Sequence, residues 1–320
     1  MTDPTTEPTD PVISTPRTRW QRVRDSDIFW SYSHSPVTII ASIVALGLIL
    51  AAAFAPWLAP HTPFQPATVN LMDGFTPPGG ESLSGETYLL GTDDQGRDML
   101  STLMYGARVS LFVGFSATLF AMALGVSLGL AAGYRGGFLD SLIMRIADVQ
   151  LSFPAILIAL LIFGVAQGLI PAARQEQTAV WVLILAIGLS NWAQFARTVR
   201  GTTMVERQKD YVSAARLLGR HPVALAIRHV LPNVLGPVLV IATISLALAI
   251  IEEATLSFLG VGVPPTQPSL GTLIRIGQRF LFSGEWWILA FPAITLILLA
   301  LSVNLLGDWL RDALNPRLRK

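Results

Sequence analysis

Residues 234–254 read VLGPVLVIATISLALAIIEEA, and this stretch carries no charge before Glu252. A helix of about 20 apolar residues crosses the roughly 30 Å of hydrocarbon in a bilayer. It also satisfies its own backbone polar groups there, so each such run predicts a transmembrane helix. Comparable runs lie at 36–57 and within 104–132, 142–165, 179–195 and 286–306. The sequence therefore predicts an all-α, polytopic helical membrane protein with about six transmembrane helices.

The composition agrees with this class. Of the 320 residues, 52% are hydrophobic and 13% are charged, whereas a soluble domain carries about 25% charged residues. Cysteine is absent, which excludes a disulfide framework, thiolate chemistry and a cysteine-based metal site. We expect the protein to lie in the lipid bilayer of the cell membrane.

The distribution of basic residues predicts the orientation. Arginine and lysine gather before the first span, between spans two and three, between spans four and five, and after the last span. These segments share one side in a six-span protein, and basic segments stay in the cytoplasm. We therefore expect cytoplasmic termini, a disordered tail over 1–35 and one transmembrane domain over 36–320. Within that domain, 58–103 is an extracytoplasmic loop and 197–232 a cytoplasmic one.

Two other features concern the loop after the first span and the packing of the second span. Residues 58–103 are rich in proline, glycine and acidic residues, which fits an ordered cap or docking face as well as it fits a passive linker. In the second span, Gly125, Gly129 and Gly133 repeat every four residues. Small residues at this spacing let a neighbouring helix approach closely. We expect a packing face there rather than the lining of a pore.

Catalytic motifs are missing from the sequence. Lys209 and Lys320 are the only lysines, and neither has the glycines and hydroxyl of the phosphate-binding loop that an ATPase requires. The four histidines form no H-E-x-x-H zinc motif, and no G-x-S-x-G nucleophile motif occurs. We expect this chain to hold no catalytic site, cofactor or metal ion.

Acidic residues inside a span are costly and usually functional. Glu252 and Glu253 lie near the outer end of the fifth span. They are candidates for a gate or for a contact with a partner outside the membrane. The alternative is a pair of carboxylates at the membrane surface. Asp148 follows Arg145 by three residues, a spacing that favours an ion pair along one helix.

The segment between the fourth and fifth spans predicts a helical hairpin. In a helix over 207–218, Tyr211, Ala214, Ala215 and Leu218 share one face, which is small at its centre. Such a face fits a groove of another protein. The basic residues of the same helix would also suit a position on the inner leaflet, and both interpretations stay open.

Glycine and proline set the limits of this hairpin. Gly219 suits the position after the first helix, where a positive φ is favoured. Pro222 suits the first turn of the second helix. We expect Pro232 to end or kink that second helix before the fifth span.

Three motifs, two of them made of two stretches each, together resemble a known family. YVSAARLLG and RHVLPN, at 211–219 and 228–233, resemble the cytoplasmic EAA loop of ABC-importer permeases of the dipeptide and oligopeptide type. LGTDDQGRDMLSTLMYGARVSL at 90–111 resembles the same subfamily. So do EATLSFLGVGVPPTQPSLGTLI at 253–274 and NLLGDWLRDALNPRLR at 304–319.

The resemblance implies one of two permease subunits that form a path for peptides. Two cytoplasmic ATPase subunits would hold ATP and Mg, and an extracytoplasmic binding protein would deliver the cargo. The coupling helix that enters a groove on an ATPase would consist of Tyr211, Ser213, Ala214, Ala215, Leu218 and Gly219. Ser213 and His229 depart from the general pattern of the family.

Other interpretations remain. The same architecture serves other cargoes, such as nickel chelates or glutathione. A stand-alone secondary transporter would be favoured by inverted repeats and broken helices at the middle of the membrane. A membrane enzyme would need a catalytic site.

Overall fold

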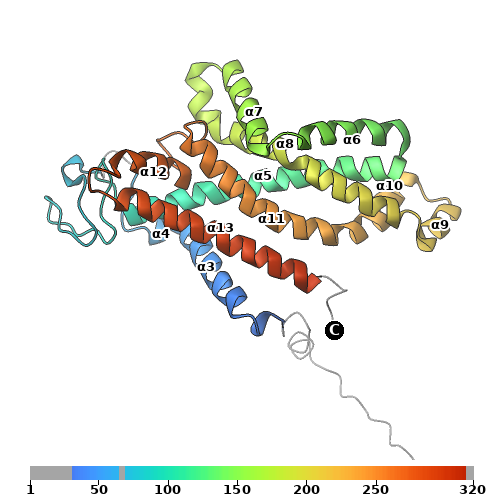
Figure 1. The fold of residues 1–320 in the computed structure, drawn as a ribbon, viewed down its shortest axis with the longest axis horizontal. Coiled ribbons are helices and arrows are strands. Elements are labelled where there is room, and N and C mark those ends of the chain that lie inside the picture. The colour runs from blue at the N-terminus through green and yellow to red at the C-terminus, as the bar shows by residue number, and fades with distance from the viewer. Residues whose placement is uncertain (1–30, 65–68, 315–320) are drawn as a thin grey trace, which may run out of the picture.

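The computed structural model describes residues 31–64 and 69–314 (Figure 1). In these residues the regular structure is helical, apart from two isolated bridges, Glu81 to Thr87 and Thr92 to Asp98. The helices long and apolar enough to span a membrane are α3 (Pro36–Ala53), α5 (Met99–Arg135), α8 (Ala172–Glu206), α11 (Leu231–Phe258) and α13 (Trp287–Leu314). A sixth span results if α6 (Gly137–Leu151) and α7 (Ala155–Leu169) count as one. The prediction of an all-α polytopic protein is confirmed.

The third apolar run is a broken helix, a feature that the predicted span did not include. The axes of α6 and α7 differ by 99°. The break falls just before Pro154, which lacks an amide hydrogen and whose ring disfavours a helical conformation at Phe153. As a result α7 turns out of the bundle and packs against the first part of α8 (Figure 1).

The predicted glycine face packs α5 directly against α8. A Cβ added to Gly125 would lie 2.5 Å from the Cβ of Phe195, and one added to Gly133 would lie 2.7 Å from the carbonyl oxygen of Arg200. Gly129 meets the backbone of Ala196 in the same way. The two backbones therefore touch over more than two turns, and the prediction of close packing is confirmed.

The two ends of the bundle differ. We call residues 58–64 and 69–98 the cap, which lies at the left in Figure 1. Its Thr92 carbonyl accepts a hydrogen bond of 3.0 Å from the indole of Trp287 at the start of α13. Beneath the cap, α12 (Leu270–Gly277) packs on α11 and α13. The described chain ends lie away from the cap, where α3 runs beside α13.

The predicted tail over 1–35 falls mostly outside the described residues. Its described part includes Tyr32, whose ring packs edge-on against Trp309 of α13 with centroids 5.3 Å apart. The final basic residues, Arg317, Arg319 and Lys320, also lie outside the described residues.

The opposite end carries the hairpin, which consists of α9 (Asp210–Leu217), α10 (Pro222–Leu225) and a π-helical turn (Ala226–Val230). The π turn leads directly into α11, so the second hairpin helix does not end at Pro232; it is distorted just before the proline instead. A π turn widens the backbone before the proline. That leaves room for the ring, which clashes with the carbonyl four residues earlier in an ordinary helix.

The glycine face yields a stability prediction. Gly129→Leu should force α5 and α8 apart and lower the free energy of unfolding by about 1–3 kcal/mol, the usual cost of overpacking. Gly164→Leu on α7 is the matched control, because no atom lies within 4 Å of a Cβ added there. Thermal unfolding of both variants in detergent measures the difference. Equal melting temperatures would contradict the packing described above.

Candidate functional site

The hairpin is anchored to the bundle by an apolar cluster, which we call the hairpin cluster. Val212 of α9 is fully buried, and Ala215, one turn later, is half-buried against the same group. The buried members are Ala121, Phe195, Val199, Val212, Leu225, Val230, Val234 and Val238. They come from α5, α8, both hairpin helices, the π turn and α11. Any shift of α9 therefore presses on three spanning helices.

Two hydrogen bonds and an ion pair also hold α9 in place. The hydroxyl of Tyr211 donates to the carboxylate of Glu206 at 2.5 Å and accepts from the amide of Asn233 at 3.0 Å. Burial and then the bond to Glu206 raise the pKa of Tyr211. Lys209 pairs with Glu206 at 2.7 Å. These contacts thus connect the end of α8 and the start of α11 to α9.

The outer surface of the hairpin is exposed to solvent, whereas its inner face is buried. Leu217 and Leu218 are 89% and 83% exposed, and Ser213 and Ala214 are also exposed. Gly219 has φ 74°, as predicted for the residue after the helix.

The predicted coupling face is consequently divided between two roles. Ser213, Ala214, Leu218 and Gly219 face solvent, whereas Tyr211 and Ala215 hold the hairpin to its own chain. The sequence analysis missed Val212. Its place three residues before Ala215 was the signal that the two share an inner face.

Ion pairs join α6 to α8 near the hairpin end. Arg200 binds Asp140 with two hydrogen bonds, of 2.5 and 2.7 Å. Asp148 pairs with Arg197 at 2.5 Å, so the predicted pair with Arg145 is wrong. An acidic residue that follows a basic one along a helix is the weaker order for such a pair, and α8 offers Asp148 a partner across the interface.

The two adjacent glutamates of α11 lie in different environments. Glu253 is fully buried and accepts a hydrogen bond of 2.7 Å from Ser257. The hydroxyls of Ser110 on α5 and Ser269 before α12 lie at the same carboxyl group. Glu253 therefore sits where three elements meet.

Glu252 points the other way and is half-buried. It accepts a hydrogen bond of 2.7 Å from Asn191 of α8. Beside Asn191, Gln150 of α6 donates to the carbonyls of Leu189 and Ser190 at 2.7 and 2.8 Å. A line of polar contacts thus runs from the α6–α7 break through α8 to α11.

These environments predict unequal costs of substitution. Glu253→Ala should lower the free energy of unfolding by about 2–4 kcal/mol, because it leaves a cavity and removes the carboxylate acceptor of a buried hydroxyl. Glu252→Ala should cost about 1 kcal/mol, the worth of one hydrogen bond. Thermal unfolding of the two variants in the same detergent compares them directly. A larger loss for Glu252→Ala would contradict the assignment.

The cap contains a hydrogen-bond network around the buried carboxylate of Asp73. Asp73 accepts from the amide and hydroxyl of Ser84, at 3.1 and 2.6 Å, and from the hydroxyl of Tyr88 at 3.3 Å. Burial opposes ionisation of Asp73, but the hydrogen bonds from Ser84 hold its pKa below the usual range. Burial and the neighbouring Asp73 and Glu86 raise the pKa of Tyr88.

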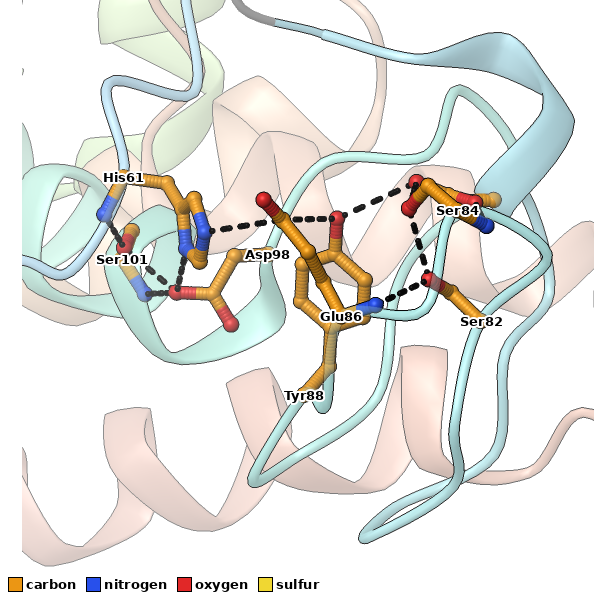
Figure 2. Close-up of polar contacts among 8 residues, drawn as sticks. His61, Ser82, Ser84, Glu86, Tyr88, Asp98 and Ser101 are labelled. Carbon is orange, nitrogen blue, oxygen red and sulfur yellow. Dashed lines mark hydrogen bonds and ion pairs between the residues drawn. The ribbon is translucent and has the colours of Figure 1, made fainter.

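A second part of this network joins the cap to α5. Asp98 caps the helix by accepting from the amide of Ser101 at 2.9 Å. Figure 2 shows His61 between Asp98 and Glu86, with nitrogen–oxygen distances of 3.7 and 3.4 Å. The described part of the loop is therefore an ordered cap, which was one of the two interpretations left open.

Comparisons with known proteins identify the family. The profile described as binding-protein-dependent transport system inner membrane component matches residues 125–320. The profile of the N-terminal transmembrane domain of oligopeptide transport permease C matches residues 20–78.

Individual relatives extend over most of the chain. It is 36% identical over 293 residues to the di/tripeptide transport system permease protein DppC of Pseudomonas aeruginosa, covering 91% of this chain and 92% of that protein. It is 36% identical to the dipeptide permease DppC of Haemophilus influenzae, with 91% and 95% coverage. It is 33% identical to the oligopeptide permease OppC of Bacillus subtilis, with 92% and 90% coverage.

The chain belongs to the family of binding-protein-dependent transport system inner membrane components. It is a multi-pass membrane permease component of an ABC importer, a class distinct from the ATPase component.

Proposed function

We propose that this chain is one of two permease subunits that form the translocation path of a peptide importer. Its relatives are named as dipeptide, di/tripeptide and oligopeptide permeases, which supports di- and oligopeptides as cargo. Two cytoplasmic ATPase subunits hydrolyse ATP, and an extracytoplasmic binding protein delivers the peptide. This chain itself binds no ATP.

The observation that carries this proposal is the two-sided hairpin. Leu217 and Leu218 are almost completely exposed beside basic residues, and exposed apolar side chains of this kind fit a protein partner. Val212 on the inner side belongs to a cluster shared with α5, α8 and α11. An ATPase that receives the outer side in a groove would move the spans through the inner side.

The two glutamates take separate roles in this mechanism. We assign Glu252 to the gate or to the contact with the binding protein, because it is half-buried and one hydrogen bond joins it to α8. Glu253 fixes α5, α11 and the start of α12 relative to one another. Glu252→Gln is expected to change uptake without changing expression.

The proposed orientation places the hairpin and both termini in the cytoplasm and the cap outside. Leu83→Cys in the cap and Gln208→Cys before α9 introduce single thiols at exposed positions of a chain that has none. An impermeant thiol reagent added to intact cells should label only Leu83→Cys. Permeabilisation should add labelling of Gln208→Cys. Labelling of both positions in intact cells would contradict this orientation.

Docking of the ATPases has its own test. Leu217→Asp combined with Leu218→Asp should abolish co-purification of the ATPases, because burial of unpaired charges costs several kcal/mol, or about a thousandfold in affinity. Leu83→Asp is the matched control, since Leu83 is 82% exposed at the other end of the molecule. The second permease subunit should co-purify with every variant.

The alternative is a hairpin that rests on the inner leaflet. In that case the aspartate variants would be mild, and neutralisation of Lys209 and Arg216 would cause the larger loss of function. Co-purification and uptake measured for both sets of variants separate the two outcomes. Retention of the ATPases by the double aspartate variant would contradict the docking proposal.

A further inference from the structure

A cavity of about 700 Å³ opens at the cap end of the bundle, between α5, the start of α8 and the loop before α12. Aromatic rings form much of its wall. Phe112 and Trp181 meet edge-on with centroids 6.0 Å apart, and Phe64 meets Tyr105 at 5.7 Å. A concave site with apolar walls and a few polar groups is the usual form of a small-molecule site.

Arg108 is the charged residue of this cavity. It lies nine residues after the start of α5, and Thr62, Pro63 and Phe64 of the cap line the same cavity. Its side chain is exposed. In the part of the chain that the structure describes, it has no ion pair and no side-chain hydrogen bond, and no acidic residue lines the cavity. A guanidinium in a spanning helix is costly unless it meets an anion.

Two amides complete the site. Gln177 of α8 and Gln267 of the loop before α12 both line the cavity. Next to them, the hydroxyl of Thr266 donates to the carboxylate of Glu176 at 2.6 Å, which fixes the loop to the start of α8. The site therefore combines an exposed cation, two amides that both donate and accept hydrogen bonds, and aromatic walls.

We propose that this cavity binds the C-terminal carboxylate end of a peptide during its passage. Arg108 pairs with the carboxylate, Gln177 and Gln267 bond the last peptide groups, and the aromatic rings contact the side chains. The inference rests on the proposed peptide cargo and adds a recognition site within the permease itself.

A thiol introduced into the cavity tests its charge and its ligand. In the complete importer complex in zwitterionic nanodiscs, Val180→Cys, at a lining position without a proposed ligand role, should react faster with a negatively charged methanethiosulfonate than with a cationic one. Arg108→Gln should abolish this preference, and Arg108→Lys should keep it. Arg174→Gln is the matched control, because Arg174 is exposed at the start of α8 but does not line the cavity.

A peptide ligand should protect the same thiol. A tripeptide with a free carboxylate should slow labelling at concentrations about tenfold lower than its C-terminal amide, as expected for the loss of one charge-assisted hydrogen bond. Arg108→Gln should equalise the two peptides. Equal protection by both peptides in the parent protein, or protection by neither, would overturn the proposal.

The phosphate of a lipid headgroup is also an anion that Arg108 could bind. Changing the lipid of the nanodisc distinguishes it from a peptide carboxylate. If lipid fills the cavity, phosphatidylglycerol nanodiscs should protect the thiol without peptide, and that result would also overturn the proposal. Uptake of the free-acid tripeptide into proteoliposomes tests the proposed function separately. Absence of any peptide uptake by the active complex would contradict the peptide cargo, whereas the labelling result concerns this cavity alone.

Discussion

The close contact between the backbones of α5 and α8 is the constraint on which the rest of the structure depends. Gly125, Gly129 and Gly133 leave no space for a side chain at this contact. It sets the positions of Phe195 and Val199 on α8, which form one wall of the hairpin cluster. If α8 stood further from α5, the hairpin would lose the surface on which it packs.

Helix α11 is one of the helices that connect the two ends of the bundle. At one end α11 continues from the hairpin through the π turn without a loop. Towards the other end, Glu252 binds α8, while Glu253 lies against α5 and the start of α12. In the proposed mechanism, a push on the hairpin by the ATPases becomes a movement of α11 against these contacts. ATP would favour one state to the extent that the ATPase pair binds it better than the other.

The sequence predicted the features that single residues determine locally. The apolar runs located the spanning helices, the glycine repeat located a packing face, and Gly219 has the positive φ expected after a helix. It failed where contacts across helices decide the outcome. Asp148 pairs with Arg197 on α8 rather than with Arg145.

The candidate site was only partly predicted, because contacts between helices determine the rest of it. The location of the hairpin follows from its glycine and proline residues, but its inner face depends on what α5, α8 and α11 present to it. Val212 is fully buried there, although the pattern favoured Ala214 and Ala215 as the contact face. Similarly, two adjacent glutamates look equivalent in the sequence, and only the packing separates Glu252 from Glu253.

The central claim is that the hairpin transmits the movement of the ATPases through its apolar inner face. Its most direct test is the number of peptides transported per ATP hydrolysed in proteoliposomes containing the Val212→Ala variant. Val223→Ala, at a 57% exposed position of the same hairpin, is the control. The account predicts that the ATPases stay bound and hydrolyse ATP while this ratio falls severalfold for Val212→Ala alone. An unchanged ratio in a stable complex would contradict it.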